Sequence, residues 1–336
     1  MTKGPYHALG MPSRREVVQG IVAGFGAFVL PRSAFAATLS ELTLFGPPAG
    51  PSIILSQAVS AGTIPEVAEK AGLKVWRNPD EMRAGLTSGT MQAVILPVQV
   101  AANLYNRGMK LKLLNVMTKG LLYIIAADPA ITSFETLKGR KLAVPFRNVM
   151  PDLVVNRLLA HFGIVSGTDL TVENTGTPVE GVQMLLAGRV DAVLVPEPAG
   201  SAAIMLGKAA GKDIRRAIDI QAVWGEVTGK EPVLPQAGMA VTDAFTAGDP
   251  GIADRLQAAL SAAADEVNAN PAEAAGIASP LLELPAPVIE ASIASSKLVA
   301  ARAREMRPAI EAMLSTLAES DPGIIGGHLP DDGFYL

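Results

Sequence analysis

Short apolar runs alternate with longer amphipathic segments between residues 41 and 249. Runs of about five apolar residues bounded by Gly, Pro or Asn predict buried strands, whereas apolar residues spaced three or four apart predict helices. This alternation is typical of an α/β fold with a largely parallel sheet. The pattern predicts strands at 41–45, 73–77, 93–96, 112–117, 121–126, 141–145, 170–173, 191–195, 215–223 and 238–241.

Two predicted helices begin with clear capping signals, at 78–81 (Asn-Pro-Asp-Glu) and at 177–180 (Thr-Pro-Val-Glu). The first side chain accepts a hydrogen bond from a free backbone N–H group, and proline suits the first helical position because it has no N–H to leave unpaired. These signals mark the ends of two strand-to-helix loops.

The last third of the chain has a different pattern, rich in Ala and helical in period. The predicted helices are 250–269, 271–279, 287–301 and 305–318, followed by an irregular tail. Because this third shows no strands, we expect it to pack back onto the first α/β unit. The chain would then cross between two lobes near 126–128 and again near 233–236.

The predicted domains follow from these crossings. Lobe 1 would comprise residues 37–126 and 236–336, and lobe 2 would comprise residues 127–235.

The first 36 residues have the order of an export signal. Arg14 and Arg15 precede an apolar stretch at 17–30, and Ser33-Ala34-Phe35-Ala36 places small residues where a signal peptidase cleaves. The paired arginines favour the twin-arginine route, and an ordinary secretory (Sec) signal is the alternative. We therefore expect a mature chain of residues 37–336 in the periplasm.

Charge and composition narrow the function classes. The formal net charge of −4 becomes −7 without the first 36 residues, which hold four basic residues and one acidic residue, and this balance argues against a nucleic-acid partner. The mean hydropathy is +0.32, but no apolar run approaches the roughly 18 residues of a membrane-spanning helix. The sequence has no Cys. We therefore expect no disulfide, no thiolate metal site, no cysteine nucleophile and no lipid anchor on a cysteine.

Residues typical of catalysis are scarce. The histidines of the mature chain are His161, in an apolar helical stretch, and His328, in the tail. Motifs of zinc proteases, nucleophile elbows, P-loops and dinucleotide loops are absent from the mature sequence. We expect a binding protein that is not an enzyme and needs no metal or cofactor.

Residues in the predicted strand-to-helix loops are the candidate ligand contacts. Ligands of open α/β sheets bind outside the carboxyl ends of the strands, where helix N-termini present unpaired N–H groups. Arg147 follows a buried strand and could clamp a carboxylate or sulfonate, or it could be a solvated loop charge. Glu197 could recognise an amine, or it could pair with Arg147.

Four further loop residues are candidates, each with a plainer alternative. Ser52 could donate its hydroxyl to a ligand or cap a helix. Gln99 and Asn148 could bind a ligand edge or stabilise turns. Thr177 is a helix cap whose backbone could also serve a ligand. Of the few large aromatics, we expect Trp76 to serve packing.

Three segments carry a family resemblance. Segment 132–144 (Thr-Ser-Phe-Glu-Thr-Leu-Lys-Gly-Arg-Lys-Leu-Ala-Val) resembles the entry into the second lobe of solute-binding proteins of ABC importers. Segment 188–198 (Gly-Arg-Val-Asp-Ala-Val-Leu-Val-Pro-Glu-Pro), and 92–97 followed by 101–108, resemble the nitrate/sulfonate/taurine group of these proteins. The resemblance covers residues 41–242 well and the helical third loosely. This chain has Phe146-Arg147-Asn148 where many members carry small residues.

The resemblance implies a two-lobed periplasmic-binding-protein type II (Venus-flytrap) fold, with two crossover strands and a helical C-terminal third. Together with the loop residues, it predicts capture of a small polar or anionic organic solute. The partners would be a membrane permease and its cytoplasmic ATPase, and we expect the binding protein to be a monomer. A periplasmic enzyme, or a binding protein that serves a sensor, is the alternative on the same scaffold.

Overall fold

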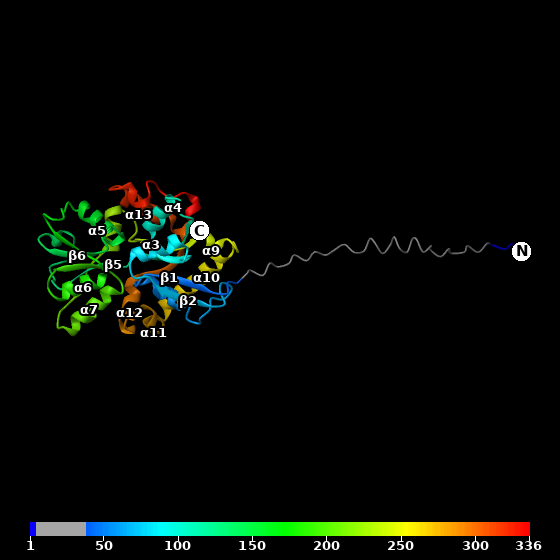
Figure 1. The fold of residues 1–336 in the computed structure, drawn as a ribbon, viewed down its shortest axis with the longest axis horizontal. Coiled ribbons are helices and arrows are strands. Elements are labelled where there is room, and N and C mark those ends of the chain that lie inside the picture. Colours follow the sequence, from blue (N-terminus) through cyan, green and yellow to red (C-terminus); the bar gives the residue numbers. More distant parts are fainter. Residues whose placement is uncertain (5–37) are drawn as a thin grey trace. The chain divides into compact units, whose positions relative to one another are not determined.

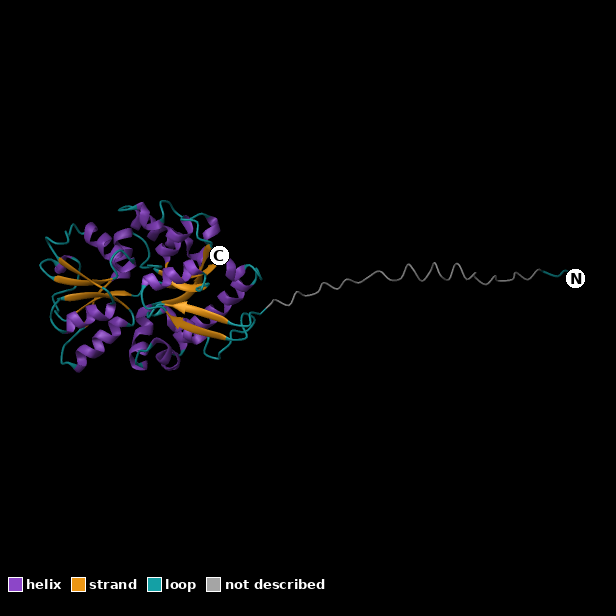
Figure 2. Ribbon diagram, viewed as in Figure 1, coloured by secondary structure: helices purple, strands orange, loops and turns teal. Residues whose placement is uncertain are grey.

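The computed structural model describes residues 1–4 and 38–336. The predicted export signal falls on residues 5–37 and lies outside the described residues. The chain divides after Ala36, and residues 37–336 form one unit. Within that unit, helices flank two separate sheets (Figure 1), and Figure 2 shows helices on both sides of the strands.

The first sheet has six strands within the described residues, in the order β11-β4-β10-β3-β1-β2. The strands are β1 (Leu42–Gly46), β2 (Ala71–Val75), β3 (Ala93–Pro97), β4 (Leu111–Thr118), β10 (Ala237–Thr242) and β11 (Leu298–Arg302). Strand β1 runs parallel to β2 and β3, whereas β10 is antiparallel to β3 and β4. The carboxyl ends of β1, β2 and β3 therefore meet at one edge of the sheet.

The second sheet has five strands within the described residues, in the order β7-β6-β8-β5-β9. The strands are β5 (Leu122–Ala126), β6 (Lys141–Pro145), β7 (Thr171–Thr175), β8 (Ala192–Pro196) and β9 (Arg215–Asp219). Strand β6 is parallel to β7 and β8, and β5 is antiparallel to β8 and β9. The two-sheet α/β architecture agrees with the predicted fold class.

The chain crosses between the sheets twice. The second crossing, at residues 229–236, includes the predicted position. The first lies at residues 119–121, because β5 pairs in the second sheet. The expected end of lobe 1 at residue 126 is therefore wrong by one strand. The strands β4 and β5 are separated by only Lys119-Gly120-Leu121, a spacing that resembles a hairpin in the sequence, but Gly120 at φ 145° directs the chain into the other sheet.

The helices cover the sheets as the alternation predicted. Those of the first α/β unit are α2 (Pro51–Ala58), α3 (Pro79–Ser88) and α4 (Val98–Asn106), and those of the second are α5 (Met150–His161), α6 (Pro178–Leu186), α7 (Ala199–Ala209) and α8 (Ile220–Thr228). The C-terminal third adds α9 (Asp243–Thr246), α10 (Ile252–Ala269), α11 (Pro271–Leu282), α12 (Ala286–Ile293) and α13 (Ala303–Ala318). As expected, α10 and α11 pack on α2 of the first unit.

Two elements differ from the sequence-based expectation. The C-terminal third contains a strand, β11, where a helix over 287–301 was predicted, because Leu298–Arg302 pairs with the free edge of β4. Apolar and small residues such as these accept either conformation, so tertiary pairing decides. The predicted strand 215–223 stops at Asp219, whose carboxylate accepts a hydrogen bond from the Ala222 N–H and so starts helix α8.

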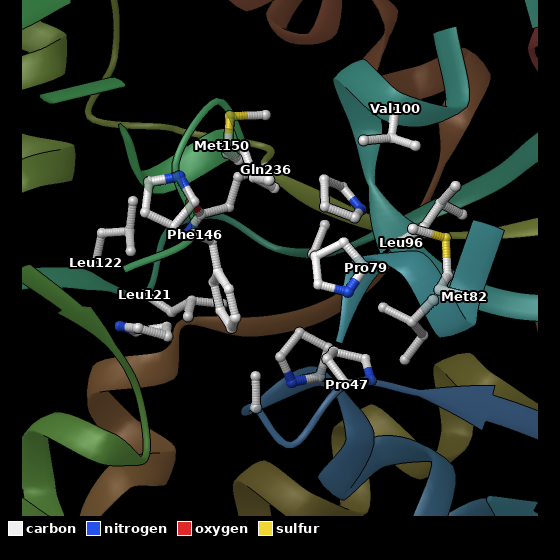
Figure 3. A pocket seen from close by; sticks show the side chains of 18 of the residues that line it. Pro47, Pro79, Met82, Leu96, Val100, Leu121, Leu122, Phe146, Met150 and Gln236 are labelled. Atoms are coloured by element: carbon white, nitrogen blue, oxygen red, sulfur yellow. The ribbon is translucent and has the colours of Figure 1, made fainter. Parts of the chain in front are cut away.

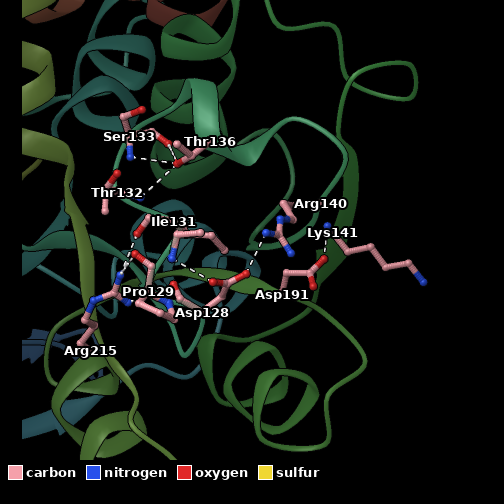
Figure 4. A network of polar contacts seen from close by, with 11 residues as sticks. Asp128, Pro129, Ile131, Thr132, Ser133, Thr136, Arg140, Lys141, Asp191 and Arg215 are labelled. Carbon is pink, nitrogen blue, oxygen red and sulfur yellow. Dashed lines mark hydrogen bonds and ion pairs between the residues drawn. The ribbon is translucent and has the colours of Figure 1, made fainter.

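Polar contacts hold the loop at 127–131, which leads from β5 into the family-like segment 132–144. The Arg215 guanidinium donates to the carbonyl oxygens of Asp128, Pro129 and Ile131 at 3.0–3.2 Å (Figure 4). Arg140 forms an ion pair with Asp128 at 2.7 Å. These contacts fix the loop that follows β5, and the family-like segment contributes Arg140 to them.

Candidate functional site

A pocket lies where the carboxyl ends of strands from both sheets meet (Figure 3). We call it the interlobe pocket. Its empty volume is about 680 Å³, including the solvent at its open side, and the clear space within it is about 90 Å³. The lining residues are Pro47, Ala49, Pro51, Trp76, Pro79, Met82, Ile95, Leu96, Pro97, Val100, Leu121, Leu122, Phe146, Val149, Met150, Pro151, Pro196, Gln236 and Ala237.

The lining comes from both lobes and from both crossings. Pro47 and Trp76 follow β1 and β2, whereas Phe146 follows β6. Leu121 lies in the first crossing and Gln236 in the second. The position matches the general rule that ligands of α/β sheets bind beyond the carboxyl ends of the strands.

The lining of the interlobe pocket is almost entirely apolar, and six of the lining residues are prolines. None of the lining side chains carries a charge. The indole nitrogen of Trp76 already donates to the carbonyl oxygen of Ile95 at 3.0 Å. Gln236 differs from the apolar lining residues. Its side-chain amide nitrogen is buried and has no hydrogen-bond partner among the described residues. A buried unpaired donor costs about 1–3 kcal/mol.

The loop after β6 places an aromatic side chain in the pocket. Phe146 has φ 57° and Asn148 has φ 61°, which are left-handed conformations that few residues other than glycine adopt. The loop is held by the Asn148 N–H, which donates to the Asp152 carboxylate at 2.8 Å, and by the Phe146 N–H, which donates to the Thr175 carbonyl at 3.0 Å. Figure 3 shows Phe146 beside Leu121 within the pocket. Backbone strain of this kind clusters at functional sites.

Backbone carbonyl groups already bind one N–H group at the start of two lobe 1 helices, α2 and α4. The Gly50 N–H, at the start of α2, donates to the Glu197 carbonyl oxygen of the other lobe at 3.0 Å. The Val98 N–H, at the start of α4, donates to the Gln236 carbonyl oxygen at 3.0 Å. Neither N–H group is therefore free to bind an anion in this conformation.

Carboxylates occupy the helix N-termini of lobe 2. Besides Asp152 at α5, Glu180 accepts from the Gly176 N–H at 2.8 Å before α6, and Glu197 accepts from the Ser201 N–H at 3.0 Å in α7. A negative charge is favourable at the positive end of a helix dipole. Lobe 2 thus satisfies its own helix ends with acidic side chains.

Glu197 forms a buried ion pair with Arg216, not with Arg147. One Glu197 oxygen accepts from Nε and Nη2 of Arg216 at 2.7 and 2.5 Å, and Arg216 also donates to the Ser201 hydroxyl at 2.7 Å. The Glu197 side chain is fully buried, whereas 28% of the Arg216 side chain is exposed. The guanidinium lies 5.5 Å from the ring centre of Tyr123. The alternative in which Glu197 pairs with Arg147 is therefore wrong.

None of the six candidate residues predicted from the sequence lines the interlobe pocket. The Ser52 hydroxyl is buried and donates to the Pro47 carbonyl at 2.5 Å, so it supports the loop after β1. Gln99 is buried in α4, with a side-chain oxygen that has no partner among the described residues. Arg147 and Asn148 are exposed. Thr177 caps α6 through the Glu180 N–H, as its alternative predicted.

Sequence reasoning missed the residues that do line the pocket. Phe146 was noticed only as a departure from a family pattern, and Trp76 was expected to serve packing. A signal was present: apolar or Pro residues, in place of small polar ones, follow the ends of β1, β2 and β6, and Pro196 is the last residue of β8.

Further polar contacts join the two lobes. The Tyr123 hydroxyl donates to the Ser295 carbonyl oxygen at 2.9 Å, and Lys297 pairs with Asp219 at 3.2 Å. Burial, with the nearby charges of Asp219 and Glu197, raises the pKa of Tyr123 to about 12. Tyr123 is therefore a neutral hydrogen-bond donor across the interface below that pH.

Metal sites and membrane-spanning helices were also considered among the described residues. No cluster of three or more His, Asp or Glu side chains suited to a metal occurs in the described part of the chain. Among the same residues, no helix has the length and apolar character needed to cross a bilayer.

Solved structures share this fold. An ABC transporter structure from Parabacteroides distasonis has 24% identity and a TM-score of 0.73, over 89% of this chain and 98% of that one. The periplasmic aliphatic sulphonate-binding protein SsuA from Escherichia coli has 18% identity and a TM-score of 0.64, over 83% and 93%. The periplasmic nitrate-binding protein NrtA from Synechocystis PCC 6803 has 16% identity and a TM-score of 0.58, over 76% and 71%. These likenesses establish the two-lobed fold.

Comparison by sequence gives the family. No curated protein matches the chain. The model of the NMT1-like family matches residues 51–282, which include the whole second sheet, four strands of the first sheet, and all the pocket lining except Pro47 and Ala49. The chain belongs to the NMT1-like family.

Proposed function

We propose that this protein is the periplasmic substrate-binding component of an ABC importer. The observation that carries the proposal is the interlobe pocket, which is formed by both lobes and both crossings, so that rotation about the crossings would open or close it. Hinge closure around a ligand is a general way for two-lobed proteins to signal occupancy. The solved structures with this fold include proteins described as binding sulphonate and nitrate in the periplasm.

Binding without chemistry is the favoured activity. The lining of the pocket offers no nucleophile, general base or charged group. A solute held there would leave unchanged and pass to a permease that recognises the closed form. The candidate export signal at residues 1–36 supports delivery to the periplasm by the twin-arginine or Sec route, and we propose that the mature chain acts as a monomer.

Mass spectrometry of the purified protein tests this function. Under native conditions, the expected spectrum contains a protein–solute complex, and extraction releases the same solute chemically unaltered. Protein without any bound small molecule, which also shows no thermal stabilisation across solute libraries, would refute the proposal. Stabilisation of about 2.7 kcal/mol is expected at 100 times the dissociation constant. Consumption of the solute during incubation would instead indicate an enzyme.

A further inference from the structure

We propose that the solute is a compact, uncharged and mainly apolar molecule that carries one hydrogen-bond acceptor, in place of the polar or anionic solute expected from the sequence. This inference rests on the proposed function, because it names the class of ligand for the same interlobe pocket.

The first argument is the chemistry of the lining. A small-molecule site usually combines an apolar wall with a few polar groups that fix orientation. Here the wall is formed by prolines, aliphatic residues, Trp76 and Phe146, with no charged side chain. An anion moved from water into such a wall would lose its hydration without gaining an opposite charge. An apolar ring or branched chain gains roughly 25 cal/mol for each Å² removed from water.

The second argument is the state of the helix N-termini, which would be the anion receptors of this fold. Carbonyl oxygens of Glu197 and Gln236 each accept from one N–H group at the start of α2 and α4. Carboxylates of Asp152 and Glu180 lie in the first turns of α5 and α6, and that of Glu197 accepts from the Ser201 N–H of α7. The negative charges of Asp152 and Glu180 oppose an anionic ligand at α5 and α6, whereas the charge of Glu197 is balanced by Arg216.

The third argument is a free hydrogen-bond donor in the pocket, which calls for an acceptor on the ligand. Gln236 is only 5% exposed, lines the pocket and has an unpaired amide nitrogen. A ligand carbonyl or ether oxygen would satisfy this donor. The enclosed part of the pocket suits one ring or a short branched chain.

Tryptophan fluorescence gives a direct readout, because the sequence has two tryptophans and only Trp76 lines the pocket. Trp224 is buried in α8 away from the lining. The Trp224→Phe variant of the full chain therefore reports on the pocket alone, and the Trp76→Phe variant controls for effects elsewhere.

The probes are cyclohexanone, cyclohexanol and methyl isobutyl ketone, each compared with an anion of similar size, cyclohexanecarboxylate or 3-methylbutanesulfonate. We expect at least one neutral probe to change the fluorescence of Trp224→Phe and to bind at least tenfold more tightly than its anionic counterpart. The same probe should leave the fluorescence of Trp76→Phe unchanged. Any co-purified solute should be neutral.

Two glutamine variants test whether Gln236 donates a hydrogen bond to the ligand. Gln236→Leu should weaken the ketone about tenfold, which corresponds to about 1.4 kcal/mol. Gln57→Leu is the matched control, since Gln57 has a buried amide oxygen without a partner among the described residues but lies on α2 outside the pocket, and this variant should leave the affinity for the ketone unchanged. Equal weakening by both variants would overturn the role of Gln236.

The outcomes separate the two proposals. Tighter binding of the anions at Trp76, or an anionic co-purified solute, would overturn the neutral class and leave the binding function intact. No response to any probe, with a neutral co-purified solute absent, overturns the neutral class. If no solute of any charge is found either, the proposed function fails as well.

Discussion

Breaking the Glu197–Arg216 pair from its two sides should have unequal effects on stability. In Arg216→Ala the carboxylate of Glu197 stays fully buried, with the Ser201 N–H as its one remaining hydrogen-bond donor among the described residues. In Glu197→Ala the guanidinium is 28% exposed, so water can solvate it while it still contacts the Ser201 hydroxyl and the Tyr123 ring.

The magnitude follows from the environment of the group left behind. Removing one partner of a buried pair costs about 3–5 kcal/mol when the other charge stays buried, and we expect this for Arg216→Ala. For Glu197→Ala we expect about 1–2 kcal/mol, because the remaining charge can be hydrated. The double variant should recover part of the cost, since it leaves no isolated charge.

Urea unfolding at pH 7, followed by tryptophan fluorescence, measures these differences. With a slope of about 3 kcal/mol per molar urea for a chain of this size, the midpoint of Arg216→Ala should fall by about 1 M or more. Arg83→Ala is the control, because its ion pair with Asp80 is exposed and 3.6 Å long, and it should shift the midpoint very little. Equal losses for the two single variants, or a larger loss for Glu197→Ala, would refute the reasoning.

Three other predictions concern the crossings and the loop after β6. Because the folded-state pKa of Tyr123 is about 12 and the unfolded value about 10, its contribution is complete below pH 10 and is lost as the pH rises toward 12. Between pH 10 and 12, the free energy of unfolding of Tyr123→Phe should therefore fall by about 2–3 kcal/mol less than that of the wild type. At pH 7 the variant should be about 1 kcal/mol less stable, because it lacks the hydrogen bond to Ser295. Parallel pH profiles of the two proteins would contradict this prediction. Gly120→Ala should destabilise by more than about 2 kcal/mol in a melting experiment, because a Cβ there would lie 1.7 Å from the Gln221 side chain and φ is 145°; a wild-type melting temperature would exclude the clash. Arg147→Ala should change the affinity of a neutral ligand less than twofold by fluorescence titration, and a tenfold loss for an anion would restore the role expected from the sequence.

The fold was predictable because its signals are local. Apolar runs such as Ala93–Pro97, and the cap at Thr177, specify a strand and a helix start without help from distant residues. The strand β11 and the position of β5 were not predictable in the same way. Each depends on which strand edge is available in the folded chain, and a run of five apolar residues contains no information on its partner.

The candidate site was predictable in location but not in chemistry. The strand-to-helix loops do surround the pocket, as the topology requires. Which side chains point inward depends on backbone detail such as the left-handed conformation of Phe146, which turns this residue inward and leaves Arg147 exposed. The partner of Glu197 is 19 residues away on β9, a pairing that no spacing rule predicts.

The six prolines of the pocket wall also affect the thermodynamics of binding. A proline side chain has almost no rotamer freedom to lose, so closing this wall on a solute costs little ordering entropy compared with a wall of lysine, arginine or glutamine. Affinity depends on what remains after such costs are subtracted. A rigid wall therefore lets a small ligand with few strong contacts bind well, and the heat capacity change on binding should be negative, as expected for burial of apolar surface.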